Sequence, residues 1–573
     1  MVLKNDQTVV CAFRRQAAAR AESVALWGRG RAGWRSWSWK QWEERARQVA
    51  AAFVQLGVES GDRVALLLGT RPEWAVLEQG ILQAGGIVCS LYPANPLERT
   101  CFMLEDAGAR VAVCEGARRA RELLQQRARL PRLEHVICFE PEPEPGERSE
   151  DAMLAAACWR EESSVLPSLP QLFALGEQRL PELRPELERR ERDLHPAGWA
   201  SLYYTSGTTR VPKGVRLSHT NLLYASQACA DAMRRECAIL EPGSVLLVAA
   251  PLAHLLGRMN LGLIYQGGAS AALESDPARL IQSCAEVGAS FFAAPPLVYE
   301  RLHARLAGAG PCALHAELGG SARWLGCAGA GLAPHITQWF WDAGLPLIES
   351  YGATEVGVAS MGQLEGMRIG SVGRPQPGTR LRVAPDGELW INGPGVMLGY
   401  HNRPEDDAAA FELRQGERWF RSGDIGHIDA DGYVWIMGRK NELFKSSSAG
   451  WISPSHLEAQ LKQACPLIAH AFAIGAGRPH VVALLALEPG QLASDERAVL
   501  AELRRDIAAL NARLSPHERI QRFSVLEAGF EKDEFTELGK PRRAVTLERH
   551  AARIDALYAE HDGCAPQAVE PAP

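Results

Sequence analysis

Apolar and polar positions near the start of the chain follow two alternating spacings. Residues 41–57 place apolar side chains at helical spacing and end at Gly57, a residue typical of helix ends. Residues 62–68 then form a short apolar run that predicts a buried strand, and residues 81–91 end one helix and begin the next strand. Repeated alternation of strands and helices predicts an α/β domain with mostly parallel sheets.

This alternation lapses between residues 140 and 195. Residues 141–148, Pro-Glu-Pro-Glu-Pro-Gly-Glu-Arg, cannot build an apolar core, and residues 181–193 are dense in Glu and Arg. We expect an exposed insertion, partly helical, and favour a solvated linker over a partner-binding segment. From Leu202 the strand–helix pattern resumes and continues to about residue 385.

Residue types change again after residue 385. Residues 386–437 are richer in β-branched and aromatic residues with turn glycines, which predicts a small β subdomain. Because 573 residues exceed what one core accommodates, we expect two domains. The first, residues 1–438, combines parallel-sheet α/β layers with the β subdomain; the second is a smaller α+β unit, residues 439–573, with a frayed tail over 560–573.

Composition and charge narrow the class of protein. Hydrophobic residues make up 46% and charged residues 23%, as in ordinary globular enzymes, and a net charge of −6 argues against a nucleic-acid partner. The 13 cysteines include no Cys-x-x-Cys pair, which predicts reduced thiols in a cytoplasmic protein. The first residues do not read as a signal peptide. The longest apolar run, residues 245–256, is too short to span a membrane, which leaves peripheral contact open.

The richest local motif is the segment 204–215, Tyr-Thr-Ser-Gly-Thr-Thr-Arg-Val-Pro-Lys-Gly-Val, which follows a predicted strand. A small, hydroxyl-rich loop of this kind can surround polyphosphate with backbone N–H groups and side-chain donors. It is not a Walker loop, and by itself it equally suits an ordinary turn between strands. The candidate phosphate ligands are Thr205, Ser206, Gly207, Thr208, Thr209 and Lys213.

This segment resembles the phosphate loop of the adenylate-forming superfamily, which contains acyl-CoA synthetases, luciferases and peptide-synthetase adenylation domains. Arg210 stands where that family usually has a glycine; the rest of the motif matches. Four further segments match in the family's order, and the matches extend from about residue 40 to about residue 560. The resemblance implies the family's fold, with a mobile C-terminal lid, and its ATP-dependent chemistry.

The segment 349–355, Glu-Ser-Tyr-Gly-Ala-Thr-Glu, is similar to the family's adenine and magnesium segment. The resemblance implies that Tyr351 packs on adenine, Thr354 touches phosphate and Glu355 holds Mg²⁺, a cation that prefers oxygen ligands. A glycine turn followed by a helix start is the alternative. Neighbouring candidates for the nucleotide and acyl site are Ser350, Gly352, Gly329, Ala330 and Gly331.

The segment 419–433 resembles the ribose-binding segment, in which Asp424 accepts bonds from the ribose hydroxyls. A β-hairpin turning at Asp431-Gly432 is compatible with that reading, because the aspartate precedes the turn. Residues 438–445 resemble the hinge between the family's two domains, with Arg439 reaching the nucleotide. The segment 537–543 resembles the one that carries the adenylation lysine, here Lys540, although a Gly-Lys in a basic stretch is usually solvated surface.

Two segments favour the long-chain acyl-CoA synthetases within the superfamily. The segment 251–258 resembles a Pro-Leu-Ala-His segment beside the acyl pocket, in which His254 gates the carboxylate site; a histidine that caps a helix is the alternative. The segment 444–454 resembles the family's Phe-Lys-x-Ser-x-Gly run, except that Ala449 replaces the expected glycine and Gly450 follows it. This departure weakens the assignment of CoA as acceptor and leaves adenylation unaffected.

The resemblance implies an AMP-forming ligase that uses ATP and Mg²⁺ to activate a medium- or long-chain fatty acid, with CoA as thiol co-substrate. The alternative enzyme transfers the acyl group to the phosphopantetheine of an acyl carrier protein. A third reading is a non-catalytic nucleotide-binding homologue. It is disfavoured because the candidate site residues of the motifs are present: Lys213, Thr354, Glu355, Asp424, Arg439 and Lys540.

Overall fold

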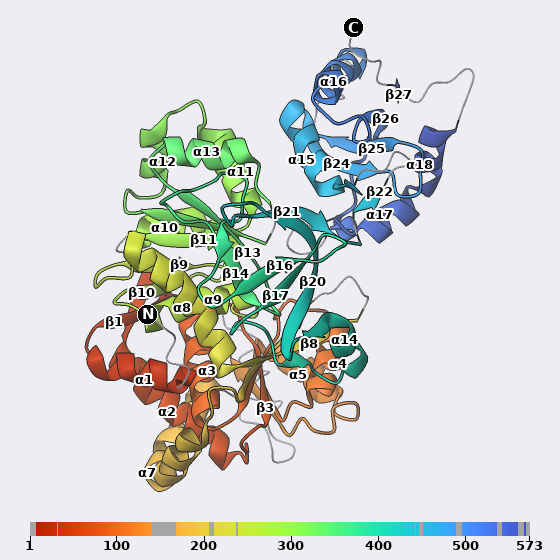
Figure 1. Cartoon of the computed structure of the whole chain (residues 1–573). Coiled ribbons are helices and arrows are strands. Elements are labelled where there is room, and N and C mark those ends of the chain that lie inside the picture. Colours follow the sequence, from red (N-terminus) through yellow and green to blue (C-terminus); the bar gives the residue numbers. More distant parts are fainter. Residues whose placement is uncertain are drawn as a thin grey trace. The chain divides into compact units, whose positions relative to one another are not determined.

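The computed structural model describes residues 7–30, 33–139, 168–205, 211–236, 239–329, 331–441, 443–445, 451–488, 496–535, 541–559 and 567–568. The chain divides into two compact units (Figure 1). Unit 1 comprises residues 1–382, 390–422 and 428–435, and unit 2 comprises residues 383–389, 423–427 and 436–573. Unit 2 therefore takes in two short segments that precede the boundary expected at residue 439.

One of the two large sheets in unit 1 has the strand order β18-β8-β7-β4-β3-β5-β6. Its central strands are parallel, as the alternating pattern predicts, and β8 and β18 add antiparallel to one edge. The strands are β3 (Arg63–Leu67), β4 (Ile87–Ser90), β5 (Val111–Glu115), β6 (His135–Phe139), β7 (Trp199–Thr205), β8 (Lys213–Ser218) and β18 (Gly399–Tyr400). The helices between them are α3 (Pro72–Gln83), α4 (Leu97–Ala107) and α5 (Ala117–Gln125).

The second sheet has the order β15-β14-β13-β12-β11-β9-β10-β1-β2 and is parallel from β13 to β1. Its strands are β1 (Val24–Gly30), β2 (Gly33–Ser38), β9 (Val245–Val248), β10 (Ser270–Leu273), β11 (Phe291–Ala294), β12 (Trp324–Ala328), β13 (Leu347–Ala353), β14 (Gly357–Met361) and β15 (Arg374–Pro375). Its helical segments are α8 (His219–Glu236), α9 (Leu255–Gly262), η1 (Leu263–Tyr265), η2 (Pro277–Arg279), α10 (Leu280–Val287), α11 (Pro296–Leu306), α12 (Pro311–Glu317) and α13 (Pro334–Asp342).

An aromatic cluster joins the first helices to the second sheet. Phe13 of α1 (Val9–Ala19) lies 4.8 Å, centroid to centroid, from Trp42 of α2 (Trp39–Gln55), and Trp39 stacks on Trp42 at 5.3 Å. Tyr265 contacts all three rings. These side chains are fully buried, so the apolar face predicted for residues 41–57 is core.

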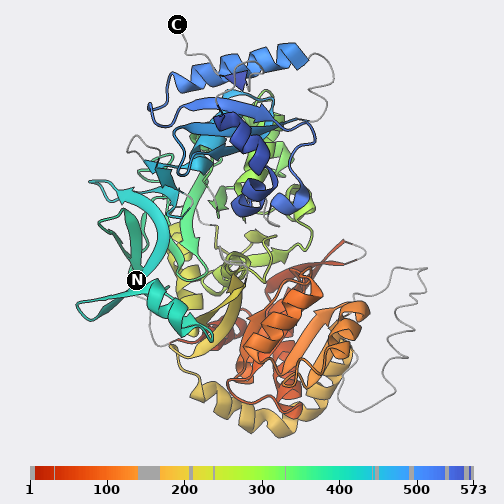
Figure 2. The same cartoon turned by 90° about the vertical axis from the view of Figure 1, so that its right-hand side faces the viewer.

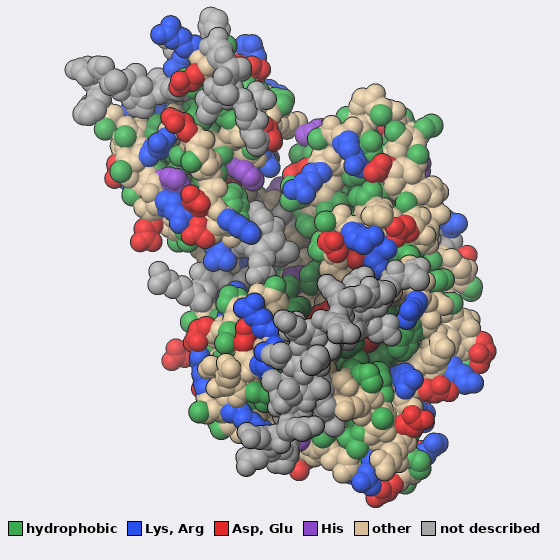
Figure 3. Space-filling view, turned by 180° about the vertical axis from the view of Figure 1, so that it is seen from behind, with side chains coloured by type: hydrophobic (Ala, Val, Ile, Leu, Met, Phe, Trp, Pro, Cys, Tyr) green, Lys and Arg blue, Asp and Glu red, His purple; other side chains and the backbone are tan. Residues whose placement is uncertain are grey.

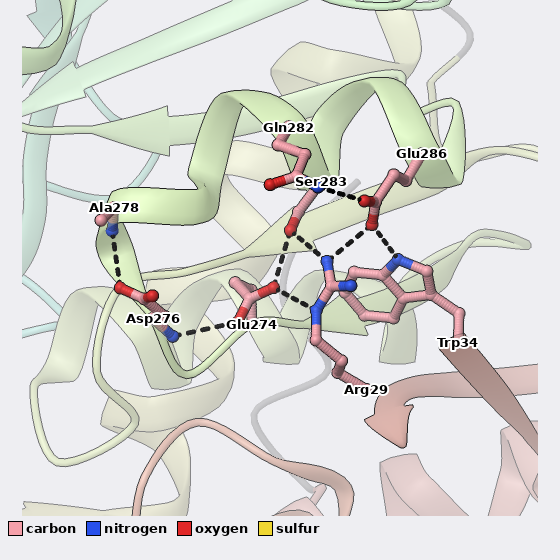
Figure 4. A network of polar contacts seen from close by, with 8 residues as sticks. All are labelled: Arg29, Trp34, Glu274, Asp276, Ala278, Gln282, Ser283 and Glu286. Atoms are coloured by element: carbon pink, nitrogen blue, oxygen red, sulfur yellow. Dashed lines mark hydrogen bonds and ion pairs between the residues drawn. The ribbon is translucent and has the colours of Figure 1, made fainter. Parts of the chain in front are cut away.

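A charged network fixes the β1–β2 hairpin to α10 (Figure 4). Arg29 donates to Glu274 Oε2 at 2.9 Å, to Ser283 Oγ at 2.7 Å and to Glu286 Oε2 at 2.7 Å. Glu274 is almost fully buried, and Ser283 and the Asp276 amide also donate to it. Burial would raise the pKa of Glu274, but these three donors hold it below its usual value.

Helix α7 (Leu169–Asp193), the long gold helix in Figure 2, occupies the described part of the expected insertion. It packs along α2, and Leu172 and Gly176 are buried there. A Cβ at Gly176 would lie 1.8 Å from the Gln48 carbonyl oxygen, so only glycine permits this approach. This half of the segment therefore differs from a solvated linker, while residues 140–167 lie outside the described residues.

The expected β subdomain is a twisted sheet with the order β16-β17-β20-β19, with β21 paired to β20. Its elements are β16 (Arg380–Val383), β17 (Glu388–Asn392), α14 (Pro404–Ala410), β19 (Phe411–Arg414), β20 (Glu417–Ile428) and β21 (Val434–Arg439). The turn after β20 includes Asp431 and Gly432, as the sequence predicts, and Asp429 accepts from the Asp431 and Tyr433 amides.

Most of unit 2 is an α+β layer built on the sheet β24-β25-β26-β27, with a separate β22–β23 ribbon. The apolar side chains of β24 and β25 pack against α15 and α16 on one face. The elements are β22 (Phe444–Lys445), β23 (Trp451–Ile452), α15 (Pro454–Ala464), β24 (Ile468–Ile474), β25 (Val481–Leu487), α16 (Glu496–Asn511), β26 (Ile520–Val525), η4 (Lys532–Glu534), α17 (Arg543–Arg549), α18 (Ala551–Tyr558) and β27 (Gln567–Ala568).

The described surface carries charges of both signs (Figure 3). On the face seen in Figure 3, positive and negative side chains are interspersed and do not gather by sign. Among the described residues, no helix combines the length and the apolar character that crossing a membrane requires. Nor do three or more His, Cys, Asp or Glu side chains of the described ranges gather as a ready-made metal ligand set.

Candidate active site

The two strands that flank the candidate phosphate loop are paired antiparallel, and Thr205 faces Lys213 in their register. Thr205 Oγ1 donates to the Lys213 carbonyl at 3.5 Å, which closes the base of the loop. A Cβ at Gly214 would lie 2.9 Å from Leu202 Cδ1, so glycine keeps β8 close to β7. Ser206, Gly207, Thr208, Thr209 and Arg210 lie outside the described residues.

Tyr204 anchors the strand that enters this loop. Its hydroxyl donates to Asp106 Oδ2 at 2.7 Å and contacts the Met103 carbonyl oxygen at 3.1 Å. Burial, together with the nearby negative charges, raises the pKa of Tyr204, so the phenol stays protonated and remains a donor. The Asp106 carbonyl in turn accepts from His401 and Asn402, and this links helix α4 to the segment after β18.

Lys213 starts β8 and is paired with a residue far along the chain. Its Nζ lies 2.5 Å from Asp406 Oδ1 and 5.3 Å from the centroid of the Tyr400 ring. Strand β18 brings Tyr400 here because Tyr400 pairs with Val215 in β8. The sequence motifs include neither Tyr400 nor Asp406, so the structure adds both to the site.

Strands β13 and β14 form a hairpin whose turn presents Thr354 and Glu355. The expected glycine turn is present, but it leads into β14 and not into a helix. A Cβ on Gly352 would lie 2.0 Å from the Gly357 carbonyl oxygen, so this turn requires glycine. Tyr351 is half-buried against the core of unit 1, and Ser350 Oγ donates to the Cys327 carbonyl at 3.4 Å.

Glu355 is half-buried, and one of its oxygens, Oε1, accepts from the Tyr400 hydroxyl at 3.0 Å. No described residue donates to Oε2. Burial raises the pKa of Tyr400, and the Glu355 charge raises it further, so this hydroxyl is a donor at neutral pH. Lys213 and Glu355 come from different sheets, and both lie against Tyr400: Lys213 over its ring and Glu355 at its hydroxyl.

Gly329 and Gly331 follow β12, next to the start of the β13 hairpin. The pairing of Ala328 with Ser350 places them there, and a Cβ on either glycine would meet nothing within 4 Å. Glu349 fixes this neighbourhood, because it accepts from Thr337 Oγ1 at 3.1 Å and from the Leu332 amide at 3.4 Å. Burial raises the pKa of Glu349. Ala330 lies outside the described residues.

His254 caps the N-terminus of α9, the structural alternative anticipated for it. Its Nδ1 accepts from the Leu256 amide at 3.1 Å, so in the neutral ring the proton is on Nε2. One turn further along α9, Arg258 forms a buried ion pair with Glu78 of α3. A role of His254 at a carboxylate stays a prediction.

Asp424 and Arg439 form an ion pair within unit 2. Arg439 Nε lies 3.0 Å from Asp424 Oδ1, and Asp424 is only 6% exposed. The next residue, Lys440, lies 2.6 Å from Asp386 Oδ2 and 3.1 Å from Glu388 Oε2. Asp424 thus lies in β20 before the hairpin turn, as both sequence readings allow.

Lys540 and Gly450 lie outside the described residues. The chain that flanks Lys540 is anchored, because Phe535 and Pro541 form a β-bridge and Arg542 Nε donates to the Phe535 carbonyl at 3.1 Å. The adenylation role of Lys540 and the pantetheine role of Gly450 stay predictions.

Comparison with known proteins agrees with this arrangement. Residues 13–401 match the family described as AMP-binding enzyme, and residues 447–562 match the AMP-binding enzyme C-terminal domain. The long-chain-fatty-acid–CoA ligase FadD15 of Mycobacterium tuberculosis is 30% identical, covering 90% of this chain and 91% of that protein. The long-chain-fatty-acid–CoA ligase ACSBG2 of Gallus gallus is 24% identical over 97% of this chain and 81% of that protein.

Solved structures share the fold. The anthranilate CoA ligase AuaEII in complex with anthranoyl-AMP superposes with a TM-score of 0.75 at 23% identity, covering 97% of this chain and 99% of that chain. ATP-bound MatB from Rhodopseudomonas palustris gives a TM-score of 0.72 at 24% identity, covering 95% and 99%.

The chain belongs to the AMP-binding enzyme family. The predicted α/β fold, the resemblance to the adenylate-forming superfamily and the enzyme class, AMP-forming acyl-CoA ligases, are confirmed.

Proposed function

We propose that the chain activates a medium- or long-chain fatty acid with ATP, releases pyrophosphate, and transfers the acyl group from acyl-AMP to the thiol of CoA. The observation that carries this proposal is the convergence of Lys213 and Glu355 at Tyr400, at the base of the candidate phosphate loop. A cation and a carboxylate that both contact one tyrosine fit a metal-bound polyphosphate, because each binds a different part of it.

In the first step, a fatty-acid carboxylate oxygen attacks the α-phosphorus of ATP and pyrophosphate leaves. Lys213 and Thr205, together with Ser206, Gly207, Thr208 and Thr209, hold the phosphates in line. Thr354 contacts phosphate, Tyr351 packs on adenine beside Ser350 and Gly352, and Lys540 neutralises charge that develops at the α-phosphate.

Glu355 fits Mg²⁺, because Mg²⁺ is often held by one or two carboxylates plus substrate phosphates, and Oε2 has no donor among the described residues. When bound, the ion would neutralise phosphate charge. Asp424 accepts from the ribose hydroxyls while its ion pair with Arg439 keeps it oriented, and Arg439 also reaches the nucleotide.

The acyl side of the site is proposed at α9 and at the glycines after β12. With its proton on Nε2, His254 is a donor for a carboxylate oxygen. Gly329 and Gly331 are exposed, and a Cβ on either would meet nothing within 4 Å, so these small residues and Ala330 leave room for an acyl chain. Phe291, Phe292 and Tyr299 are fully or almost fully buried and serve as core beside it. The names of the curated relatives support a long-chain acid.

Residues 439–573 are proposed as a lid that follows a domain of residues 1–438 and turns about the hinge, in a cytoplasmic enzyme. Turning would withdraw Lys540 after the first step and bring Gly450 to the pantetheine arm. A carrier-protein phosphopantetheine is the second candidate acceptor, because the alanine at position 449 weakens the assignment of CoA.

A comparison of half-reactions tests the proposal. Lys540→Ala should abolish acid-dependent pyrophosphate exchange while largely sparing thioester formation from supplied acyl-AMP. Equal loss of both half-reactions would contradict the role of Lys540. Gly450→Val should block transfer to CoA and spare exchange, whereas Ala449→Gly should transfer to CoA as well as the parent or better. If the parent forms acyl-AMP but no acyl-CoA, and Ala449→Gly restores transfer, the carrier-protein acceptor is favoured.

A further inference from the structure

Lys213 and Glu355 carry opposite charges, yet no ion pair joins them in the described part of the chain. Lys213 is paired with Asp406, and Glu355 accepts from Tyr400. A direct pair would neutralise both groups and leave neither for phosphate or metal, since each charge-assisted contact competes with a ligand for the same atoms.

Tyr400 separates the two charges. Its ring faces the Lys213 ammonium at 5.3 Å and its hydroxyl contacts Glu355 at 3.0 Å, so the side chain contacts both groups. Tyr400 is only 9% exposed, and it is held by strand pairing with Val215 and by the hydrogen bond from its amide to Asp407 Oδ1 at 2.6 Å. Tyr400 is therefore fixed from its backbone and does not depend on either charge.

Asp406 is placed by the same segment. Pro404 begins α14, and Asp407 accepts from the Tyr400 amide, which sets the first turn of the helix beside β8. In that turn Asp406 faces Lys213, with both side chains between one fifth and one third exposed, at 23% and 30%. The exposed Glu405 between Pro404 and Asp406 has no partner among the described residues, so the three consecutive acidic residues are not equivalent.

We propose that Asp406 holds Lys213 away from Glu355 and competes with phosphate for it, and that Tyr400 keeps the two charged groups of the site apart. Both are positioning residues, and the assignment rests on the proposed function of Lys213 as a phosphate ligand. When a phosphate arrives, Lys213 exchanges one anionic partner for another. When pyrophosphate leaves, Asp406 takes the ammonium back.

The first experiment measures binding of ATP and of pyrophosphate by calorimetry, with no acid and no acceptor present. Asp406→Asn removes the competing charge, so both dissociation constants should fall roughly two- to fivefold, the range of a partly exposed ion pair. Glu405→Gln is the matched control and should leave both unchanged. Asp406→Glu restores a carboxylate and should restore binding close to that of the parent.

A double-mutant cycle shows whether the effect passes through Lys213. In a Lys213→Met background, Asp406→Asn should no longer tighten pyrophosphate binding. Tyr400→Phe keeps the ring and should bind pyrophosphate as the parent does, whereas Tyr400→Ala lets Lys213 reach Glu355 and should weaken binding.

Weaker or unchanged binding by Asp406→Asn overturns the assignment, because a purely structural carboxylate would not oppose the ligand. The assignment is also overturned if Asp406→Asn still tightens pyrophosphate binding in the Lys213→Met background. If the parent protein binds neither ATP nor pyrophosphate, the proposed function itself fails, and this outcome is distinct from a parent that binds both while Asp406→Asn gains nothing.

Discussion

Replacing Arg258 by Met tests how helix α9 is held. Arg258 is 1% exposed and pairs with Glu78, which is fully buried in α3. The guanidinium also lies 5.5 Å from the centroid of the Tyr265 ring, whose hydroxyl accepts from Gln79 at 3.0 Å. Because α9 begins at the cap residue His254, this pair fixes the helix that carries the candidate acyl-site histidine.

The expected loss in the free energy of unfolding is large, because the Glu78 carboxylate that remains is fully buried and cannot be hydrated. Removing one partner of a buried ion pair costs about 3–5 kcal/mol, since the other is left desolvated. Removing both charges, with Arg258→Met and Glu78→Gln together, should recover most of that loss. An exposed arginine in α8 provides the control. Arg234→Met removes an ion pair with Asp231 and should lower the free energy of unfolding by about 1 kcal/mol or less.

The cost should depend on pH with a definite sign. Burial raises the pKa of Glu78, and without Arg258 only the hydrogen bond from Gln79 still opposes that shift. When the pKa of a carboxyl is raised in the folded state, the folded protein becomes less stable as the pH rises above the pKa of that carboxyl in the unfolded chain, about 4.5. Arg258→Met should therefore be closer to the parent at about pH 4.5 than at about pH 7, whereas the double variant should show no such trend.

Hydrogen exchange of the α9 amides, with scanning calorimetry of the whole chain, measures these differences. In Arg258→Met, the amides of residues 255–262 should exchange about 100-fold faster or more at neutral pH, since about 2.7 kcal/mol corresponds to that factor. Protection equal to that of Arg234→Met, or a double variant as unstable as the single, would refute the reasoning.

Three further outcomes follow from contacts elsewhere. Asp424→Asn should raise the Michaelis constant for ATP more than it lowers kcat, because it weakens bonds to ribose worth about 1.5–3 kcal/mol each at most; an unchanged constant would place Asp424 in the hairpin alone. Arg29→Met should destabilise unit 1 by about 1.5–3 kcal/mol at neutral pH and by less below about pH 4. The reason is that the pKa values of Glu274 and Glu286 are lowered in the folded state, so the stability that these carboxylates contribute is lost as the pH falls. Denaturant unfolding measures this, and an equal loss of stability in Arg29→Met at both pH values would contradict the reasoning. Gly176→Ala should speed proteolysis within α7, because a Cβ there meets the Gln48 backbone, whereas Gly308→Ala, where a Cβ meets nothing within 4 Å, should not; similar cleavage of the two variants would argue against the close helix contact.

The spacing of apolar residues predicted several helices and strands correctly. This spacing, and the glycines that end helices, are signals that a few neighbouring residues are enough to carry. The helix expected at 41–57 is α2, and the strand expected at 62–68 is β3. The same reasoning could not find the close α7–α2 packing. Leu172 and Gly176 precede a run rich in Glu and Arg that reads as exposed, and their burial depends on α2, a helix far earlier in the chain.

Motifs in the sequence predicted which residues are chemically competent, but not which of them meet. Lys213 and Glu355 were found because each stands in a recognisable segment, whereas their partners Tyr400 and Asp406 come from a strand of two residues and a seven-residue helix. The sequence does contain a sign of this helix: Pro404 is followed by three acidic residues, a pattern that indicates a helix start. Only the pairing of β18 with β8 shows what that helix start faces.

The central claim is most directly tested by product analysis with a purified protein, a panel of carboxylic acids, ATP, Mg²⁺ and CoA. The account predicts AMP and pyrophosphate formed in equal amounts only when a medium- or long-chain fatty acid is present, with one acyl-CoA for each AMP. Glu355→Gln and Lys213→Met should lose this activity, while Glu405→Gln should retain it. Formation of ADP, or nucleotide turnover that is independent of any acid, would contradict it.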